Sequence, residues 1–475
     1  MKLKMRTQTM PRLLINGELL EGQRSSEVVN PATGAAFATV SIASEAQLDQ
    51  AVQSASDAAP RWARTEWAHR ASVLSSLAVC IRDNGEELAQ LITLEQGKPL
   101  AGSRRELQFA AAAFESVARL RLEPQPYERQ ANRSITGFRS PLGVVGAIAT
   151  WNYPLMTMAS KISVALMAGN TVVLKPSPNT PIATLRFGEL VRHLLPAGVL
   201  NIITDANDLG ALLVRHPKID LVSFTGSTKV GRQIAREAGN DVKHLVLELG
   251  GNDAAIVLSD SHPTQIADSI FRAAFQNAGQ TCLAIKRLYV HERIYAQLTN
   301  ELVLRAQAAV VGDGMDARTQ IGPVQNQGQY ARAQAIIDAA RQEGVVAAGG
   351  ETHGPGYFVR PTIVTNIADG SQLVDDEQFC PVLPIIRFSD EEDALERANA
   401  SSLGLGGSVW SPDVERAGAL ARRLEVGTAW VNNHMDISLN APVGGVKQSG
   451  YGVEFGGAES LAQFTRETVL HLPSA

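Results

Sequence analysis

Residues 141–177 read PLGVVGAIATWNYPLMTMASKISVALMAGNTVVLKPS, and this stretch holds two compact apolar runs on either side of a longer one. The first, PLGVVGAIATW, is bounded by turn-forming residues and is typical of a buried strand. PLMTMASKISVALMAG predicts a helix that ends at Gly169, and NTVVLKPS predicts a second strand. Since strands joined through a helix pair in parallel, the stretch predicts a βαβ unit and the α/β fold class.

The alternation of strand and helix patterns continues toward the C-terminus. GVLNIIT at 198–204 predicts a third strand, and IDLVSFTGS at 219–227 predicts a fourth that turns into the helix KVGRQIAREAG. Parallel sheets bind ligands at the carboxyl ends of their strands. The motifs WNYP, KPSP and FTGST follow three of these strands, so we expect them to meet along one edge of the sheet.

The composition narrows the class of partner. The chain has 475 residues, of which 45% are hydrophobic and 19% charged, as in globular proteins with a large interior. Its 43 basic and 48 acidic residues give a formal net charge of −5. Nucleic acids and anionic membranes both require a clustered positive field. We therefore expect no nucleic-acid and no membrane partner.

The cysteines indicate the compartment. Cys80, Cys282 and Cys380 are widely spaced, and they form neither a disulfide framework nor a CxxC metal motif. We expect no bound metal and a reducing environment. The basic start MKLKMRTQTMPRLL is followed by no apolar run suited to a signal peptide, and no stretch resembles a membrane helix. We therefore expect a cytoplasmic protein.

Changes of pattern suggest how the chain is divided. PRLLINGELLEG contains an Asn-Gly turn signal between short strands, and apolar residues three and four apart predict helices over 45–122, with Cys80 on their apolar face. A second alternating region begins near LVLELGGND. The predicted units are a first α/β domain of residues 1–123 and 142–246, a second α/β domain of 247–440, and a β element of 124–141 and 441–475.

Two segments of the β element alternate polar and apolar residues like exposed strands. They are YERQANRSITGFRSPLG at 127–143 and ESLAQFTRETVLHL at 459–472. Exposed edge strands are liabilities unless they are paired. We expect both segments to pair with another subunit and the protein to be a homo-oligomer.

Two motifs suggest phosphate binding. In FTGSTKVG, Gly226 and Ser227 precede a helix whose free N–H groups and positive end could hold a pyrophosphate, although a serine before a helix is often only a cap. In KPSP, Lys175 could reach a ribose or a phosphate from the end of its strand, although a lysine at such a position is often simply solvated.

Three residues are candidates for catalysis. Asn152, in WNYP, places an amide at the end of the first strand, where it could also serve only a turn. Glu248, in LELGGND, lies among apolar residues, so it is either salt-bridged or a base with a raised pKa. Cys282, in NAGQTCLAIKR, lies among small and polar residues, and it either fills a gap at a helix end or is a nucleophile.

Together these motifs resemble the aldehyde dehydrogenase superfamily over essentially the whole chain. The resemblance runs from INGELLEG and VNPATG through TWNYP, KPSP, FTGST, LELGGND, GQTC and EQFCPV to PVGGVKQSG at 442–450. LELGGND followed by GQTC is its most specific part. The resemblance implies a Rossmann-like NAD(P)-binding domain, a second α/β catalytic domain and a small β oligomerisation element, assembled as a homodimer or homotetramer.

The resemblance also implies a reaction, the oxidation of an aldehyde to the carboxylic acid with NAD(P)+. Cys282 would attack the carbonyl as a thiolate, and the Asn152 amide with the backbone N–H of Cys282 would hold the oxyanion. Hydride loss leaves a thioester, and Glu248 would activate the water that hydrolyses it. Small neighbours, Gly279 and Thr281, would leave space for aldehyde and nicotinamide at the sulfur.

The resemblance carries over a set of cofactor contacts, with Lys161 in a supporting role near the site. Trp151 and Lys175 match positions at the adenosine end, Ser227 matches a pyrophosphate contact, and Glu377 with Phe379 matches the nicotinamide end. The expected cofactor-binding residues are Trp151, Lys175, Ser177, Pro178, Gly226, Ser227, Leu249, Glu377 and Phe379.

Three positions depart from the family pattern. Pro178 replaces a glutamate that bonds the adenosine ribose and disfavours a 2′-phosphate, so NAD is favoured only by family habit and NADP stays open. Cys380 replaces a glycine and should change the packing near the nicotinamide ribose. Thr150 replaces the proline before Trp151, with a small expected effect.

The family positions also suggest the walls of the substrate funnel. The expected lining is Tyr153, Thr157, Ser160, Thr281, Leu283, Ile437 and Val443. Tyr153 is the one aromatic residue of this set, which predicts a fairly open mouth of mixed polarity. No arginine is placed to receive a carboxylate, which disfavours a dicarboxylic semialdehyde.

Three other functions stay open. A CoA-acylating semialdehyde dehydrogenase typically lacks the base at Glu248, and a non-catalytic member of the fold would lack the nucleophile, the base or the amide. A cysteine hydrolase would need an activating histidine, for which His434 is the near candidate.

Overall fold

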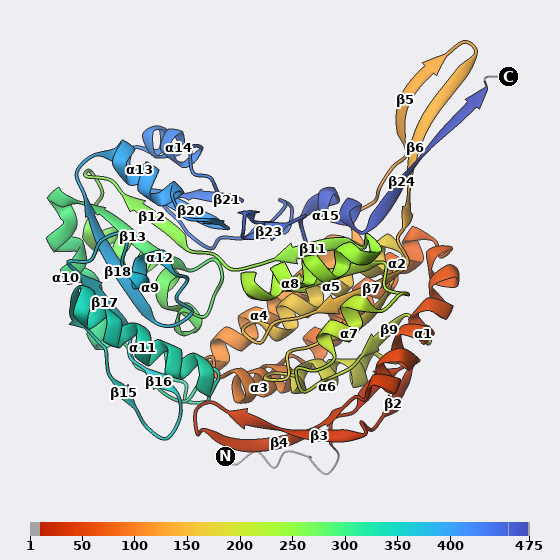
Figure 1. Cartoon of the computed structure of the whole chain (residues 1–475), viewed down its shortest axis with the longest axis horizontal. Coiled ribbons are helices and arrows are strands. Elements are labelled where there is room, and N and C mark those ends of the chain that lie inside the picture. The colour runs from red at the N-terminus through yellow and green to blue at the C-terminus, as the bar shows by residue number, and fades with distance from the viewer. Residues whose placement is uncertain (1–9, 455, 474–475) are drawn as a thin grey trace.

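The computed structural model describes residues 10–454 and 456–473, which form two α/β lobes and a projecting arm. Figure 1 shows the first lobe in red to green, the second in teal and blue, and the arm at the upper right. Residues 1–9, 474 and 475 of the predicted units lie outside the described part. This architecture is the predicted one, two α/β domains with a small β element.

The first lobe is built on an eight-stranded sheet in the order β2-β1-β9-β8-β7-β10-β11-β23. The neighbours from β9 to β11 run parallel, and β1, β2 and β23 join antiparallel at the edges. The strands are Leu13–Ile15 (β1), Glu18–Leu20 (β2), Val144–Ile148 (β7), Thr171–Lys175 (β8), Leu200–Ile202 (β9), Leu221–Thr225 (β10), His244–Glu248 (β11) and Gly450–Tyr451 (β23).

Helices cover both faces of this sheet because its strands are apolar on both sides. Val145 and Ala147 of β7 pack with α2 to α6, whereas Val144 and Ile148 pack with α1, α7 and α8. The helix α5 ends at Gly169, as predicted, with a left-handed φ of 95°. The helices are Glu45–Ala63 (α1), Trp67–Asp83 (α2), Gly85–Gln96 (α3), Leu100–Ala118 (α4), Pro154–Ala168 (α5), Ile182–Val191 (α6), Gly210–Arg215 (α7) and Thr228–Ala238 (α8).

The second lobe repeats the design on a seven-stranded sheet in the order β14-β17-β18-β13-β12-β20-β21, with β14 alone antiparallel among these described strands. The strands are Asp253–Val257 (β12), Ile285–His291 (β13), Val345–Ala348 (β14), Thr362–Thr365 (β17), Val382–Phe388 (β18), Gly406–Trp410 (β20) and Thr428–Val431 (β21). Helices again pack on both faces: Pro263–Phe275 (α9) and Glu292–Ala308 (α10) on one, and Gln327–Glu343 (α11), Gln372–Asp375 (α12), Glu391–Asn399 (α13) and Val414–Ala421 (α14) on the other.

Shorter elements complete the chain. They are the hairpin Arg24–Asn30 (β3) and Ala35–Ile42 (β4), the pair Thr352–His353 (β15) and Phe358–Val359 (β16), the pair Leu403–Gly404 (β19) and Val446–Lys447 (β22), the helix Gly457–Gln463 (α15), and the 3-10 turns Gly239–Asp241 (η1) and Gln276–Gly279 (η2). The predicted Asn-Gly turn joins β1 to β2, with positive φ at Asn16 and Gly17. Cys80 lies half-buried on α2 against the first core. In the described ranges no helix is long and apolar enough to cross a membrane.

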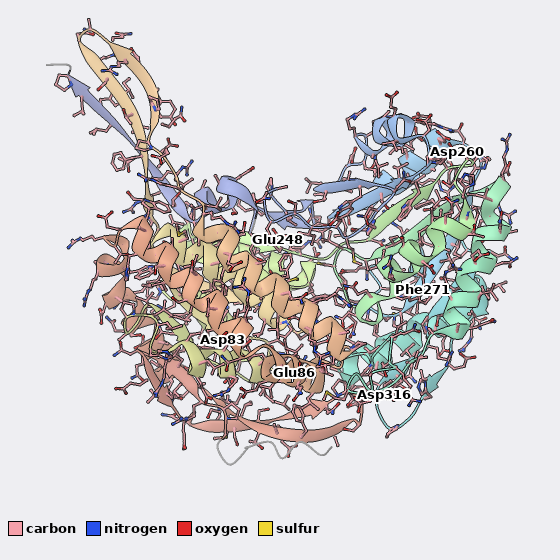
Figure 2. All side chains as sticks on the ribbon, turned by 180° about the vertical axis from the view of Figure 1, so that it is seen from behind. Asp83, Glu86, Glu248, Asp260, Phe271 and Asp316 are labelled. Atoms are coloured by element: carbon pink, nitrogen blue, oxygen red, sulfur yellow. The ribbon has the colours of Figure 1, made fainter. Side chains whose placement is uncertain are left out.

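The border between the two predicted α/β units needs correction. A boundary at residues 246 and 247 would cut β11, yet all five residues of that strand pair with β10 in the first sheet. The chain reaches the second sheet only at Asp253, the start of β12. We therefore place the border between Glu248 and Asp253, so that Glu248 ends a strand of the first lobe beside the second (Figure 2).

The two alternating segments pair with each other and form the arm from Gln125–Gln130 (β5), Arg133–Pro141 (β6) and Thr465–Pro473 (β24). The sequence predicted strands here but not this pairing within the chain, and pairing with another subunit stays a prediction. β6 lies in the middle and satisfies the hydrogen bonds that an exposed strand would lack. The side chains of Tyr127, Val469 and Leu472 stay exposed on this arm, which leaves contact with another subunit as an expectation.

Candidate active site

The candidate site forms where adjacent parallel strands of the first sheet end. Asn152 follows β7, Lys175 ends β8, Ser227 follows β10, and Glu248 ends β11. These four strands are neighbours in the order β8-β7-β10-β11. Their carboxyl ends open on a cavity of about 1590 Å³ whose opposite wall comes from the second lobe. The predicted meeting of WNYP, KPSP and FTGST at one sheet edge is thereby confirmed.

Most of the predicted site residues line this one cavity. They are Trp151, Asn152, Tyr153, Thr157, Lys175, Ser177, Pro178, Gly226, Ser227, Leu249, Thr281, Cys282, Leu283, Glu377, Phe379 and Ile437. Glu248 lies just behind the wall, beside the lining residue Leu249.

Two residues expected in the substrate funnel do not line it. Val443 is buried, because the loop that carries it is packed so closely that a Cβ on Gly444 would lie 2.7 Å from the Gly452 carbonyl oxygen. Ser160 is buried inside α5, where its hydroxyl donates to the Met156 carbonyl at 2.9 Å. In both cases close packing, rather than residue type, removes the side chain from the cavity.

Cys282 stands after a turn of unusual backbone conformation. Asn277, Ala278 and Gly279 have consecutive left-handed φ values of 54°, 56° and 70°, a geometry that costs free energy for residues other than glycine. A Cβ on Gly279 would lie 2.4 Å from the Cys380 carbonyl oxygen. The small residue at 279 is therefore required by the turn itself, whereas we expected it to leave room for ligands.

The thiol of Cys282 is half-buried on the cavity wall. Desolvation, reinforced by the negative charges of Asp253, Glu377 and Glu248, raises its pKa to about 12, and the buried ammonium of Lys286 opposes that shift. The thiol is therefore protonated at neutral pH in this arrangement. Its use as a nucleophile requires a group that takes the proton as the carbonyl is attacked.

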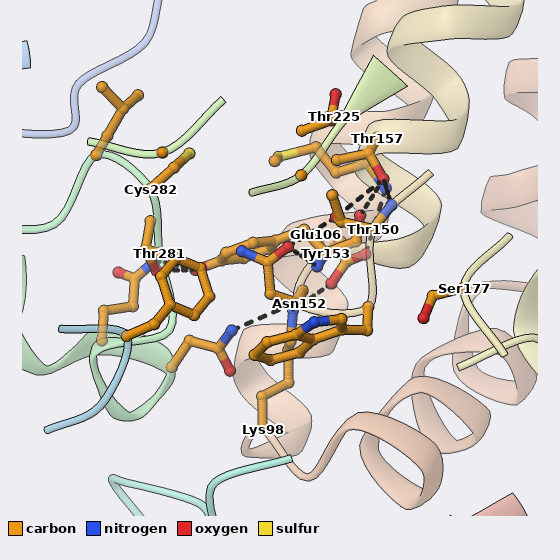
Figure 3. Close-up of a pocket in the computed structure, with 18 of the residues that line it drawn as sticks. Lys98, Glu106, Thr150, Asn152, Tyr153, Thr157, Ser177, Thr225, Thr281 and Cys282 are labelled. Carbon is orange, nitrogen blue, oxygen red and sulfur yellow. Dashed lines mark hydrogen bonds and ion pairs between the residues drawn. The ribbon is translucent and has the colours of Figure 1, made fainter. Parts of the chain in front are cut away.

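The Asn152 side chain lies close to the chain segment of Cys282. Its Nδ2 donates to the carbonyl oxygen of Gln280 at 2.9 Å, two residues before the cysteine. Asn277 reinforces the link, because its Nδ2 donates to the Asn152 carbonyl at 3.2 Å. The amide at the end of β7 and the turn before Cys282 therefore form one connected unit across the two lobes (Figure 3).

Glu248 is buried, and its Oε1 has no hydrogen-bond partner in the described part of the chain. Desolvation and the nearby charge of Glu454 raise its pKa well above the usual value, and the Lys161 ammonium acts in the opposite direction. Lys161 is ion-paired with Glu454 and donates to the Thr225 hydroxyl at 2.8 Å. The three charged groups form a buried cluster directly behind the cavity.

Sequence reasoning missed a buried ion pair beneath the Asn152 loop. Lys98 and Glu106 form this pair with side chains only 2% and 0% exposed. Lys98 also donates to the Asn152 carbonyl at 2.7 Å, and its Nζ lies 3.7 Å from the centre of the Tyr153 ring. Glu106 accepts the backbone N–H of Leu155 at 2.9 Å at the start of α5. Lys98 lies in the short connection between α3 and α4, and Glu106 lies in the ordinary helical pattern of α4, so no local signal distinguished them.

The far end of the cavity carries the features expected of a dinucleotide site. Ser227 caps α8 by accepting the Val230 N–H at 3.3 Å. The rings of Trp151 and Phe379 meet edge to face at 5.5 Å. Glu377 accepts the N–H of Gly251 at 3.1 Å. Backbone N–H groups at a helix start and two aromatic rings suit a phosphate and a planar ring, respectively.

Lys175 is not free at this end. Its Nζ donates to Asp205 Oδ1 at 2.9 Å, and both side chains are buried. Asp205 in turn accepts the N–H of Leu209 at 3.1 Å. Cys380 is buried in the second core, as its small size suggested. Sequence reasoning gave Asp205 no role, although its carboxylate also lines the cavity.

The mouth beyond Cys282 is more aromatic than the sequence suggested. Phe109, Phe271 and Phe275 all line the cavity, and the last two rings lie 4.7 Å apart. They come from α4 and α9, whose helical patterns indicated only burial. Figure 2 marks Phe271 in the second lobe.

No metal-binding cluster of His, Cys, Asp or Glu occurs in residues 10–454 and 456–473. His434, the near candidate for activating a cysteine hydrolase, is committed elsewhere. Its Nδ1 lies 2.9 Å from the Ser408 hydroxyl, and its Nε2 lies 3.5 Å from the carboxylate of Asp253. A hydrolase with a Cys282–His434 pair is therefore disfavoured.

The fold and the cavity define an α/β enzyme with a thiol at the junction of two parallel sheets. Residues 20–470 match the aldehyde dehydrogenase family, and the chain belongs to that family of oxidoreductases. It is 38% identical over 471 residues to a phenylacetaldehyde dehydrogenase from Pseudomonas fluorescens. The aligned region covers 94% of this chain and 93% of the relative. It is 36% identical over 462 residues to a betaine aldehyde dehydrogenase from Rhizobium etli, covering 95% of each.

Solved structures agree with this assignment. The fold matches a crystal structure of betaine aldehyde dehydrogenase from Staphylococcus aureus in complex with NAD+ with a TM-score of 0.95 at 31% identity, covering 98% of this chain and 95% of that one. The predicted membership of the superfamily, and the two-domain α/β fold that it implied, are confirmed.

Proposed function

We propose that this protein oxidises an aldehyde to its carboxylic acid with NAD(P)+, through a thiohemiacetal and a thioester on Cys282. The observation that carries the proposal is the joining of three groups at one cavity. The Cys282 thiol and the Asn152 amide line it, and Glu248 precedes the lining residue Leu249, near enough to Cys282 for its charge to raise the pKa of the thiol. Nucleophile, neutral donor and base are the three functions that the reaction requires.

In the first step, Cys282 attacks the aldehyde carbonyl as its proton leaves. Because the pKa of this thiol is raised, the proton must pass to an acceptor during the attack. Negative charge then develops on the former carbonyl oxygen. The Asn152 Nδ2 and the backbone N–H of Cys282 stabilise that oxyanion as donors fixed in advance.

Glu248 acts in the second half of the reaction. Its Oε1 lacks a partner and its pKa is raised, so it is suited to accept a proton from the water that attacks the thioester. This residue also separates the proposal from a CoA-acylating enzyme, because water needs such a base and a thiol acyl acceptor does not. The presence of Cys282, Glu248 and Asn152 together argues against a non-catalytic member of the fold.

The residues at the far end of the cavity fit a nicotinamide dinucleotide. Ser227 opens α8, and a Cβ on Gly226 would lie 2.4 Å from the Phe224 ring, so glycine fits there without displacing that ring. Trp151, Phe379 and Glu377 complete the set of contacts. When bound, the dinucleotide would supply the hydride acceptor. The related protein from Staphylococcus aureus was solved with NAD+.

We favour NAD over NADP because of Lys175. Its charge is neutralised by Asp205, so it offers little net attraction to a 2′-phosphate. Asp205 thus supplies the acidic group that Pro178 cannot provide.

The aldehyde that suits this cavity has an apolar tail. Phe109, Phe271 and Phe275 line the cavity that holds Cys282, and one of the related proteins is named for phenylacetaldehyde. An aromatic or aliphatic tail fits these rings. We further propose a cytoplasmic homodimer or homotetramer, with the exposed side chains of the arm as its contact surface.

The proposal is tested with a panel of propanal, phenylacetaldehyde and betaine aldehyde, each with NAD and with NADP, following NADH or NADPH formation and release of free acid. Cys282→Ala should abolish turnover, whereas NAD binding measured by calorimetry should persist. A Cys282→Ala protein that still forms NADH would refute the assignment. Acid release without reduced cofactor would instead indicate a hydrolase.

A further inference from the structure

Thr150 occupies the position before Trp151 where the family pattern has proline, and we expected the change to have little effect. Its hydroxyl, however, donates to Asn152 Oδ1 at 2.7 Å (Figure 3). A proline cannot make this bond, since it has no side-chain donor. The residue that departs from the pattern therefore contacts the amide on which the proposed oxyanion site depends.

Every polar position of the Asn152 amide can be accounted for. Oδ1 accepts from the Thr150 hydroxyl and from the Tyr153 N–H at 3.1 Å. One hydrogen of Nδ2 goes to the Gln280 carbonyl. The second has no acceptor among the residues that the structure describes. An amide carries two donors and two acceptor lone pairs, so this N–H is its one uncommitted group.

We infer that Thr150 is a positioning residue that, together with the Tyr153 N–H, fixes the Asn152 carboxamide with its oxygen turned away from the reacting carbonyl and its free N–H available to the oxyanion. The two ends of a carboxamide have nearly the same shape, so packing alone cannot choose between them. A reversed amide would present oxygen to the developing negative charge. Donation to Oδ1 also polarises the amide and strengthens its N–H as a donor.

The surroundings of Thr150 hold its hydroxyl in this role. Its backbone N–H donates to the Thr157 hydroxyl at 3.4 Å, and that hydroxyl donates to the Tyr153 carbonyl at 2.9 Å. The Thr157 hydroxyl proton therefore goes to the Tyr153 carbonyl, and the Thr150 hydroxyl donates to Asn152 Oδ1. Thr157, expected in the substrate funnel, thus also braces the loop between β7 and α5.

The inference rests on the proposed oxyanion role of Asn152, and the test separates the two. Thr150→Val keeps the shape and removes the hydroxyl, whereas Thr150→Ser keeps the hydroxyl. The readouts are the rate constant of the NADH burst, KM, the Kd for NAD and the thermal midpoint. The aldehyde is whichever of propanal, phenylacetaldehyde and betaine aldehyde gives the highest kcat/KM.

We expect Thr150→Val to slow the burst about fivefold, the effect of one hydrogen bond, with KM and the Kd for NAD within about twofold of wild type. Thr150→Ser should restore the burst. A merely structural role would instead lower the thermal midpoint and change the Kd for NAD along with the rate.

The outcomes are distinguishable. If Asn152→Ala slows the burst but Thr150→Val does not, the oxyanion role stands and the inference about Thr150 is wrong. If Thr150→Ser is as slow as Thr150→Val, the hydroxyl is not the cause and the inference also fails. If Asn152→Ala itself has no effect, the proposed function of that amide fails and the inference about Thr150 fails with it.

Discussion

The ion pair of Lys98 and Glu106 beneath the Asn152 loop gives the most quantitative prediction. Replacing Lys98 with methionine keeps the length of the side chain and removes its charge. Glu106 then remains in a site where its side chain has no exposed area, with backbone N–H groups at the start of α5 as its remaining donors. Breaking one partner of such a pair costs about 3–5 kcal/mol because it leaves an uncompensated buried charge.

Two effects of opposite sign act on the cost of Lys98→Met, and the compensating one keeps the expected value near the lower end of this range. The variant also loses the bond from Lys98 to the Asn152 carbonyl and the contact with the Tyr153 ring. The positive end of α5 partly compensates the carboxylate of Glu106. We therefore expect a loss of about 3 kcal/mol, which for a lobe of this size lowers the thermal midpoint by about 6 °C. Because the Asn152 carbonyl is released, kcat should fall as well.

The assay is thermal unfolding followed by circular dichroism at a fixed scan rate. The matched control is Arg104→Met on α4, the helix that carries Glu106, and it removes an ion pair to Glu86 whose side chains are 52% and 54% exposed. Exposed pairs contribute about 0–1 kcal/mol, so the control should melt within about 2 °C of wild type. The double variant Lys98→Met, Glu106→Gln should recover part of the loss. If Lys98→Met melts like Arg104→Met, the reasoning is refuted.

Three further predictions concern the reaction and its specificity. Because burial and the charge of Glu454 raise the pKa of Glu248, kcat should fall as the pH is lowered through that raised value. Glu248→Gln should give an NADH burst, then stall, and lose this pH dependence in stopped-flow traces; an unchanged steady-state rate would exclude the base role. Asp205→Asn should reduce the preference for NAD over NADP about tenfold in fluorescence titrations, since Lys175 regains a net charge, and an unchanged ratio of Kd values would contradict this. Phe271→Ala should lower kcat/KM for phenylacetaldehyde about tenfold and leave that for propanal unchanged, whereas equal losses for both would show that the ring does not contact the tail.

Local patterns in the sequence were sufficient for the elements and for much of the site. The apolar run at 141–151 contains β7, and Gly169 ends α5. Both are short-range signals, and the structure has the strand and the helix end where they predict them. The motifs that follow β7, β8 and β10 met at one edge because parallel strands place their ends together. This rule was enough to predict that Asn152, Lys175 and Ser227 lie around one site, and all three line the same cavity.

The same local reasoning failed where two distant segments had to be compared. Val443 seemed suited to the funnel, but close packing of its loop buries it. The alternating segments of the arm were correctly seen as strands, yet their partner could not be chosen, because β6 and β24 are separated by most of the chain. An alternating pattern shows that a strand needs a neighbour and does not say which one.

The sequence by itself determined that this protein has two α/β domains and that its site lies at the carboxyl edge of a parallel sheet, and the resemblance of its motifs to the family singled out Cys282, Asn152 and Glu248. The spacing of apolar residues, the turn-forming residues and the ends of strands depend on a few consecutive residues, so the sequence alone predicts them. Only the tertiary structure decided that Lys98 supports Asn152, that Asp205 neutralises Lys175, that the phenylalanines of α4 and α9 line the mouth, and that Thr150 fixes an amide. The first three join residues that are far apart in the chain. The contact of Thr150 with Asn152 is local, but it depends on the direction of a hydroxyl that the surrounding packing sets.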